Sequence, residues 1–415
     1  MLLMRNILLI FFVAFFSVAK AQRNEILDSQ ISSLQVVADD NWLSIPIIEL
    51  GTNQRININF DDLTHQYRRF AYKLEHCEAD WSVSSQLFES DFVSGFASGN
   101  LIEDIEESVN TTVLYTHYRM SIPNRNCNIK MSGNYRLTIY DDNDEEKPVI
   151  VAYFMVVEPI MGVQLSMSSN TDVDINQSHQ QIAMQINYGN MRVINYQDQI
   201  KTVLLQNGLW SNARINAKPQ YVMTNGLRWE HCRNFIFDGG NEYHKFEVLD
   251  PTHPTLGVDR IDWDGHDYQV YLFPDVPSFN YVYDFDANGS FYIRNSDNIE
   301  NDRISDYVLV NFTLHTPQKY DGDIYINAKW TNDQFLPRYK MLYDEQNNIY
   351  HTTISLKLGY YSYQYLLIDR NGNIQRVPSE GNFFQTENLY DALIYYREQG
   401  GRTDRLVGYG HLETR

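Results

Sequence analysis

Alternating side chains in the segment from Phe60 to Trp81 constrain the fold of this chain more than any other feature. Larger side chains alternate with smaller or charged ones from Phe70 to Cys77, and a period of two is typical of a strand with one buried face. The same alternation runs from Ile56 to Phe60, before Asp61 and Asp62 interrupt it. The segment therefore predicts two strands joined by a polar loop.

That loop would bring Asp61 and Asp62 near His76 and Asp80, which is the most enzyme-like cluster in the sequence. A histidine beside carboxylates can act as a general base, and paired acids can cleave glycosides. However, no G-x-S-x-G elbow follows, and the acids stand where turn residues belong. We therefore favour a polar network that fixes loops under Trp81, because buried polar groups need hydrogen-bond partners.

Several short motifs follow one another along nearly the whole chain. They are FDDL at 60–63, HC at 76–77, DW at 80–81, S-x-N-T at 108–111, SGNY at 132–135, QNG at 206–208, GGNE at 239–242, D-x-NG at 286–289, LGYYSYQY at 358–365, EGN at 380–382 and TEN-x-Y at 386–390. In order and spacing the set resembles the plug protein family of the Bacteroidetes type IX secretion system. The motif residues, which we expect to be structural, are Asp61, Asp62, His76, Asp80, Trp81, Asn110, Gly133, Asn134, Gln206, Asn207, Gly239, Asn241, Glu242, Gly381 and Asn388.

The resemblance implies a non-enzymatic periplasmic protein that docks on a large outer-membrane β-barrel translocon and occludes its periplasmic opening. It implies no cofactor, no direct membrane anchor and a monomeric protein within the complex. It assigns no interface residues; our hypotheses for the docking surface are residues 82–108 and the stretch 402–406. The alternative functions are a glycan-binding envelope protein that uses the third domain and an enzyme that uses His76 and Asp80.

The first 21 residues have the features of a secretory signal peptide. Arg5 precedes an apolar run from Ile7 to Val18, and Ala19-Lys20-Ala21 is a small-x-small cleavage site. The run is shorter than the roughly 20 residues needed to span a bilayer. We expect cleavage after Ala21 and an exported, soluble protein.

The chain is strongly acidic, with 33 basic and 53 acidic residues and a formal net charge of −20. Removing residues 1–21 also removes Arg5 and Lys20, so 31 basic residues face the same 53 acids and the net charge becomes −22. Such a charge repels nucleic acid and anionic membrane surfaces. Nucleic-acid binding is therefore not expected.

The chain has three cysteines, an odd number, and no C-x-x-C motif, which argues against a disulfide scaffold. They are Cys77, Cys127 and Cys232. One bridge, between Cys77 and Cys127, is possible, but we favour buried free thiols. The doublets at 76–77 and 231–232 suggest zinc at first sight. Adjacent strand residues point to opposite faces, however, so no metal is expected.

Aromatic residues make up 14% of the chain and helical periodicity is scarce, so we predict an all-β protein of three tandem β-sandwich, immunoglobulin-like domains. The third resembles the early-set modules found beside carbohydrate-active enzymes. The predicted divisions are a signal peptide at 1–21, domains at 22–158, 159–302 and 303–397, and a tail at 398–415 that is ordered only where it docks. Residues 101–108 are predicted to form a short helix, and 141–146 a hairpin turn.

Asp284, Asp286, Asn288 and Gly289 match the first half of a calcium loop. The twelfth position is Asn295 instead of Glu, and strand-like residues flank the match. We favour a β-turn on Asn288-Gly289.

Trp330 and the tyrosines from Tyr360 to Tyr365 are candidates for stacking on sugar rings. Alternation places Tyr361, Tyr363 and Tyr365 on one face, which suits a sandwich core equally well. We favour packing and keep glycan binding as the alternative.

GGNE at 239–242 resembles a phosphate-binding loop only in its glycines, since no Lys-Ser/Thr pair follows. A turn or bulge is the favoured interpretation.

Overall fold

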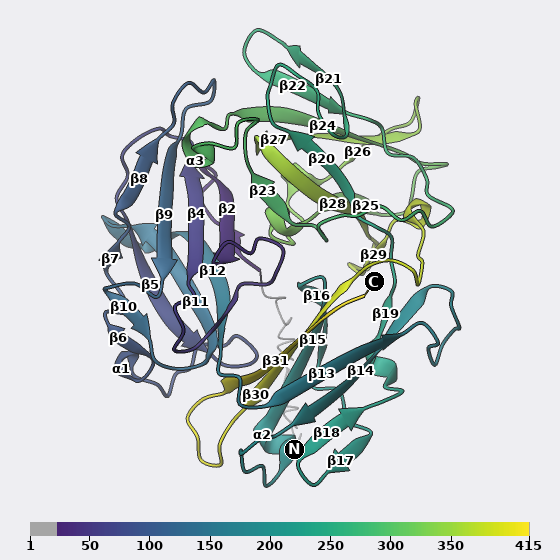
Figure 1. Ribbon diagram of the computed structural model, residues 1–415. Coiled ribbons are helices and arrows are strands. Elements are labelled where there is room, and N and C mark those ends of the chain that lie inside the picture. Colours follow the sequence, from purple (N-terminus) through teal and green to yellow (C-terminus); the bar gives the residue numbers. More distant parts are fainter. Residues whose placement is uncertain (1–22, 415) are drawn as a thin grey trace, which may run out of the picture.

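The computed structural model describes residues 23–414, in which strands dominate and sheets pack face to face (Figure 1). Most buried apolar side chains gather in three clusters, which we call the first core (residues 31–156), the second core (161–237 and 390–407) and the third core (246–377). The prediction of an all-β fold is confirmed. The predicted signal peptide at 1–21 lies outside the described residues.

The first core lies between two sheets. One sheet contains, in spatial order, β1 (Glu25–Ile26), β12 (Asp144–Val157), β11 (Gly133–Asp141), β5 (Phe70–Cys77) and β7 (Asn100–Leu101), with β3 (Ile47–Glu49) parallel to β12. The other contains β2 (Ile31–Ala38), β4 (Ile56–Asp62), β9 (Thr116–Ile122) and β8 (Asp104–Glu107), and a small pair joins β6 (Val93–Gly95) to β10 (Cys127–Ile129). The rings of Phe60 and Phe70 contact across this core, with centroids 5.6 Å apart. The two strands predicted from alternation therefore exist, but they lie in opposite sheets.

Two predictions in this region are wrong and one is confirmed. Strand β4 does not stop at Phe60 but continues through Asp61 and Asp62, because both acids find buried partners. The predicted helix at 101–108 is instead β7 and β8, since the acidic side of β8 pairs with Arg119 on β9. The predicted turn at 141–146 does connect a hairpin, that of β11 and β12.

The second core is built from two separate parts of the chain. Its first sheet contains β13 (Gly162–Ser168), β14 (His179–Asn187), β18 (Gly226–Trp229) and β17 (Tyr221–Met223), with β19 (Ile236–Asp238) also paired to β14. Its second sheet contains β16 (Leu209–Ile215), β15 (Ile200–Gln206), β30 (Leu389–Tyr396) and β31 (Arg405–Glu413). Asn207 and Gly208 of the QNG motif both have positive φ, which the tight β15–β16 turn requires.

The third core also lies between two sheets. One contains β20 (His244–Val248), β28 (Gly359–Ile368) and β23 (Phe291–Ile293), with β25 (Asp323–Asn327) and β29 (Ile374–Arg376) paired to β28. The other contains β21 (Val258–Trp263), β22 (Tyr268–Leu272), β24 (Tyr307–His315), β27 (Ile349–Lys357) and β26 (Leu342–Asp344). Strands β22 and β24 run parallel, and the remaining pairs within these two sheets are antiparallel.

The predicted divisions at residues 302 and 397 do not follow these sheets. Strands β20 to β23 lie before residue 302 but belong to the third core, whereas β30 returns to pair with β15 of the second core. The predicted tail contains β31, which forms a full edge strand on β30. Long-range strand pairing decides these boundaries, and it leaves no local mark in the sequence.

Helical segments are short. They are α1 (Glu89–Phe92), α2 (Tyr196–Gln199), α3 (Asn301–Ile304) and the 3-10 turns η1 (Arg233–Phe235), η2 (Lys329–Thr331), η3 (Pro337–Tyr339) and η4 (Pro378–Glu380). Within residues 23–414, none of them is long and apolar enough to cross a membrane. Cys77, Cys127 and Cys232 are buried and free, as predicted.

A fourth apolar cluster connects the first and second cores. It contains Ile45, Ala79, Met155 and Val157 from the first part of the chain and Val203, Leu205, Leu393, Tyr395 and Leu406 from the second core's strands and their flanks. Apolar burial is the main non-directional stabilising force between packed elements. The cores are therefore joined by continuous packing as well as by polar contacts.

Candidate functional site

The predicted acid cluster is divided between two places. Asp61 and Asp62 lie on β4 and His76 lies on β5 in the opposite sheet. Asp80 accepts hydrogen bonds from the backbone and hydroxyl of Ser82 at 3.0 and 2.6 Å. Among the described residues, no hydrogen bond or ion pair joins either β4 acid to His76 or Asp80. The expected proximity of the four residues is therefore wrong.

His76 is buried and connects a loop of the first core to the chain's last segment. Its Nδ1 lies 2.9 Å from Ser84 Oγ, which in turn lies 2.9 Å from Thr403 Oγ1. Burial lowers the pKa of His76, which favours the neutral ring. A Cβ at Gly133, whose φ is +149°, would lie only 2.2 Å from His76 Nε2, so this position requires glycine.

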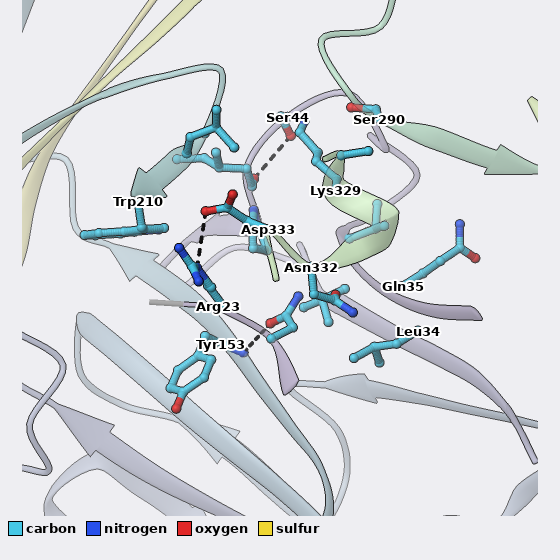
Figure 2. A pocket seen from close by; sticks show the side chains of 18 of the residues that line it. Arg23, Leu34, Gln35, Ser44, Tyr153, Trp210, Ser290, Lys329, Asn332 and Asp333 are labelled. Carbon is cyan, nitrogen blue, oxygen red and sulfur yellow. Dashed lines mark hydrogen bonds and ion pairs between the residues drawn. The ribbon is translucent and has the colours of Figure 1, made fainter. Parts of the chain in front are cut away.

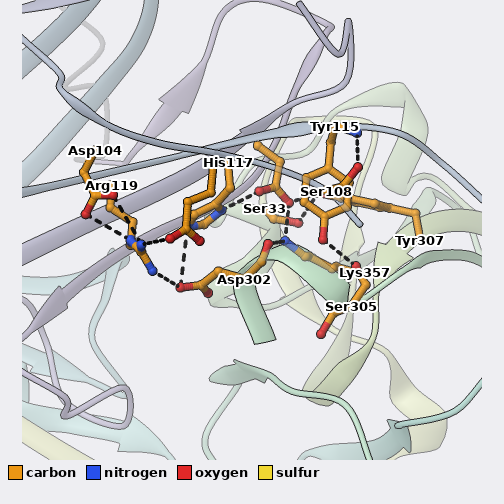
Figure 3. Close-up of polar contacts among 12 residues, drawn as sticks. Ser33, Asp104, Ser108, Tyr115, His117, Arg119, Asp302, Ser305, Tyr307 and Lys357 are labelled. Carbon is orange, nitrogen blue, oxygen red and sulfur yellow. Dashed lines mark hydrogen bonds and ion pairs between the residues drawn. The ribbon is translucent and has the colours of Figure 1, made fainter. Parts of the chain in front are cut away.

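Asp61 forms the centre of a polar joint between the first and third cores, which we call the lysine joint. Figure 3 labels three of its members, Lys357, Tyr307 and His117. Lys357 Nζ, at the end of β27, donates to Asp61 Oδ2 at 2.7 Å, and the Tyr307 hydroxyl donates to the same oxygen at 2.6 Å. His117 Nδ1 lies 2.6 Å from the other carboxylate oxygen. The Lys357 and Asp61 side chains are 1% and 0% exposed, so water does not screen the pair.

The environment keeps Asp61 charged. Burial alone would raise the pKa of Asp61, but the charge of Lys357 and the hydrogen bond with His117 outweigh it and hold that pKa below its usual value. Lys357 Nζ also lies 4.0 Å from the ring centroid of Tyr115, a cation–π distance. Both oxygens of the Asp61 carboxylate are therefore paired, one with Lys357 and Tyr307 and the other with His117.

A second layer of contacts surrounds the lysine joint. Arg119 of β9 contacts Asp104 and Glu106 of β8 and reaches Asp302 of α3 at 3.1 Å (Figure 3). The 108–115 loop is held by Asp306, which accepts the backbone N–H of Thr112 at 2.7 Å. The motif residue Asn110 supplies a positive φ in that loop.

Asp404 forms the corresponding joint between the first and second cores, which we call the aspartate joint. It accepts from Ala79 N at 3.1 Å, Lys201 Nζ at 2.7 Å and Arg397 Nε at 2.8 Å. Burial opposes the charge, but these donors together lower the pKa of Asp404. Nearby, the Tyr395 hydroxyl donates to the motif residue Asn134 at 2.8 Å.

The two stretches hypothesised as docking surfaces contact each other at this joint. Arg402 Nη1 lies 2.9 Å from Asp91 in α1, and Thr403 bonds Ser84. Part of 82–108 and part of 402–406 thus serve the connection between cores.

Motif residues also bring the two parts of the second core together. Asn388 Nδ2 donates to Gln180 Oε1 at 3.0 Å and to Gly239 O at 2.7 Å, and Asn207 Nδ2 donates to Asn388 Oδ1 at 2.8 Å. Gln206 Nε2 donates to the Asp238 carbonyl at 2.8 Å. These side-chain amides satisfy buried backbone groups where the returning chain closes the sheet.

The remaining motifs surround the irregular segment between β22 and β23. Asn241 Nδ2 donates to the Glu380 carbonyl at 2.9 Å, and Glu242 Oε1 accepts the Tyr281 hydroxyl at 2.5 Å. Asp286 accepts the backbone N–H of Tyr243, and burial raises the pKa of Asp286 to about 7. GGNE is thus a turn packed against the chain, since a Cβ at Gly239 would lie 2.0 Å from the Phe383 carbonyl oxygen.

The calcium-like match is a turn. Asn288 and Gly289 both have positive φ, as a two-residue turn of this type requires. Asp286 Oδ1 accepts the Asn288 N–H at 2.6 Å. Among the side chains that the structure describes, no group of three or more His, Cys, Asp or Glu is placed to hold a metal ion.

A cavity of about 150 Å³ lies where the three cores meet (Figure 2). Arg23 pairs with Asp333 at 3.3 Å at its edge, and the rings of Trp81 and Trp210 contact edge to face at 5.2 Å. Lys329 Nζ donates to the Leu43 carbonyl at 2.8 Å, and burial lowers the pKa of Lys329 to about 8. The motif residue Trp81 therefore helps to close the junction of all three cores.

The tyrosine row lies in the third core. Tyr361, Tyr363 and Tyr365 are buried, and the hydroxyls of the last two donate to Asp275 at 2.9 and 2.6 Å. Trp330 is buried and its Nε1 donates to the Ser362 carbonyl at 3.0 Å. A sugar ring cannot stack on faces that the core already covers, so packing, the favoured interpretation, is confirmed.

Sequence reasoning missed the charged residues opposite Asp61 and the centre of the aspartate joint. Lys357 follows His351, Thr353 and Ser355 at alternate positions of β27, so the pattern places it with the polar, solvent-facing side chains and gives no signal of its burial. Asp404 gives no signal either, because its neighbours are polar.

Comparison with known proteins agrees with this architecture. The family model of the type 9 secretion system plug protein 1st domain matches residues 31–158. The crystal structure of a hypothetical protein from Parabacteroides merdae is 36% identical, covers 94% of this chain and 99% of its own, and superposes with a TM-score of 0.91. A partial N-terminal region of an enterococcal surface protein is 7% identical over 94% of this chain and 95% of its own, and its TM-score of 0.17 carries no argument. No curated protein matches.

The matched region contains the motif residues Asp61, His76, Trp81 and Asn134, through which the first core contacts the other two. The likeness to the Parabacteroides protein extends over all three cores. The chain belongs to the type 9 secretion system plug protein family.

Proposed function

We propose that this protein is a non-enzymatic periplasmic plug that docks on the outer-membrane barrel of the type IX translocon and occludes its periplasmic opening. A wide water-filled barrel cannot stand open, so a stopper must fill its mouth whenever no cargo does. The stopper has to resist deformation, because a body that opens between its domains would leak.

The observation that carries this proposal is the locking of the first core to both others. The lysine joint ties it to the third core through Asp61 and Lys357, residues 296 positions apart. The aspartate joint and the fourth apolar cluster tie it to the second core. Because sites built from packed elements and buried charges allow little relative motion, the three cores form one rigid body.

The candidate residues support a binding role more than catalysis. Asp61 is held charged by Lys357, and His76 is held by Ser84 and Ser132 away from the acids. General acid–base catalysis needs a group within reach of a substrate proton, and these groups are buried in joints. The predicted signal peptide supports export, and the net charge of −20 disfavours nucleic acid as a partner.

The test is affinity purification from the native envelope after mild detergent extraction. Both ends of the described chain are held, Arg23 by Asp333 and Thr414 by Asn388, so a terminal tag would disturb them. The exposed turn at 346–347, between β26 and β27, is a better place for a tag, because its hydrogen bonds go to Asp344 of the same turn. Recovery of a large outer-membrane barrel is expected; recovery of the protein alone, where the barrel is demonstrably present, would contradict the proposal.

A further inference from the structure

An exposed apolar segment connects β22 to β23, and we call residues 276–285 the strap. Phe279 and Val282 are 73% and 71% exposed, and Val276, Tyr283 and Phe285 are also exposed. Single exposed apolar residues are ordinary, but Val276, Phe279, Val282 and Phe285 lie within ten positions, and such a concentration of exposed apolar side chains marks an interaction site.

The strap differs from the surface around it. Within residues 276–285, all of which the structure describes, no residue belongs to a strand. From 277 to 283 the sequence PSFNYVY has no charged side chain, although the whole chain has a net charge of −20. The one charged residue of the strap, Asp284, pairs with Lys245 at 2.5 Å. The strap is thus a mainly apolar strip, uncharged from 277 to 283, on a strongly acidic protein.

Fixed contacts hold the strap at its ends and in its middle. At its start Asp275 accepts hydrogen bonds from Tyr363 and Tyr365 and pairs with His244 at 2.9 Å. Ser278 N donates to the Ser379 carbonyl at 2.8 Å.

Farther along the strap, motif residues make the contacts. Tyr281 is anchored by Glu242, and Asp286 ends the strap by accepting the N–H of Tyr243. Gly381 has a φ of +75°, and a Cβ there would lie 2.8 Å from the Ser278 carbonyl oxygen. The strap is therefore held in place by residues of three motifs, GGNE, EGN and D-x-NG. A segment anchored in this way presents its apolar side chains in a fixed arrangement, which lowers the entropic cost of binding.

We propose that the strap is the surface that docks on the translocon barrel, and that it contacts an uncharged apolar surface at the periplasmic mouth of the barrel. This inference rests on the proposed function. The charge distribution selects this partner over two others: anionic lipid headgroups and a second copy of the chain would both meet the repulsion of a −20 body around the strap. An extended backbone with apolar side chains can also add to β-structure in the partner.

The test compares two matched double variants in the tagged full-length protein. Phe279→Ser with Val282→Ser removes the exposed centre of the strap. Tyr221→Ser with Val222→Ser removes similar side chains, 54% and 61% exposed, from the edge strand β17 of the second core. Both variants are expected to keep the wild-type melting temperature, since neither pair is buried.

The strap variant is expected to recover about tenfold less barrel than the wild type, the size of effect typical of interface anchors, and the β17 variant is expected to recover as much as the wild type. A photo-reactive phenylalanine analogue at position 279 is expected to crosslink to the barrel, and one at 221 is not.

Other outcomes overturn the strap assignment. If the strap variant recovers the barrel in full, the plug function stands and the strap is not its contact. If the wild type self-associates in sedimentation and the strap variant does not, the partner is a second copy of the chain. If the wild type floats with anionic vesicles and the strap variant does not, the partner is a membrane. If the wild type recovers no barrel, the proposed function fails first, and the assigned partner of the strap fails with it.

Discussion

Replacing Lys357 by Met tests whether the lysine joint holds the first and third cores together. The substitution keeps the apolar stem of the side chain and removes only the charge that lies 2.7 Å from Asp61. Breaking a buried ion pair by removing one partner costs about 3–5 kcal/mol, because the other charge stays buried. His117 and Tyr307 still bond Asp61, so we expect a loss near the lower limit, about 3 kcal/mol.

Urea unfolding followed by the fluorescence of the six tryptophans measures this loss. The control is Lys319→Met: Lys319 also pairs with an acid, Glu345 at 3.5 Å, and lies 5.4 Å from the Tyr343 ring, but both charged side chains are exposed. An exposed pair contributes about 0–1 kcal/mol, so the control should stay close to the wild type.

The double variant Asp61→Asn with Lys357→Met distinguishes the energy of the ion pair from other effects of the two substitutions on stability. Once the carboxylate is neutral, no uncompensated charge remains, and the double variant should lose less than the sum of the two single losses. A loss below about 1 kcal/mol for Lys357→Met, or an additive double variant, would refute the reasoning.

Three further predictions concern other contacts. Gly133→Ala should lower the free energy of unfolding by about 2 kcal/mol or more, because the added methyl group meets the His76 ring and the backbone has a positive φ. Adding His76→Ala should restore part of the lost melting temperature, and no restoration would contradict the contact. Burial raises the pKa of Asp286 to about 7, so the folded protein keeps a proton there that the unfolded chain releases near pH 4. The free energy of unfolding, measured in urea and compared with that of Asp286→Asn, should therefore fall by about 3 kcal/mol from pH 5 to pH 8. The same pH dependence of stability in both proteins would refute this prediction. Asp404→Asn should lower the free energy of unfolding by about 1–3 kcal/mol, because Lys201 and Arg397 lose their charged partner. Amide hydrogen exchange should become faster than in the wild type in β31 but not in β24, and an equal increase in both strands would count against the aspartate joint.

Local patterns predicted local structure well. Alternation located β5 and the buried face of β28, and the Asn-Gly pair located the turn at 288–289. These features depend on a few neighbouring residues, whose periodicity and backbone preferences act within the segment itself.

Partners distant in the sequence were not predictable in the same way. The sequence around Asp61 suggests a turn residue, and only the structure shows that Lys357, 296 positions later, lies beside it. Strand β30 looks like part of a third domain until its pairing with β15 is known. The alternation of Tyr281 and Tyr283 in the strap resembles a strand, but no strand forms there, since Glu242 holds Tyr281 and Asp286 holds the backbone of Tyr243.

Occlusion of the barrel is the central claim, and conductance measures it directly. Purified translocon barrel in a planar bilayer should pass a large ionic current through its open pore. Addition of the full-length protein to the periplasmic side should lower that current at low and high salt alike, and the strap variant should fail to do so at the same concentration. Binding of the wild-type protein without any fall in conductance would contradict the plug function.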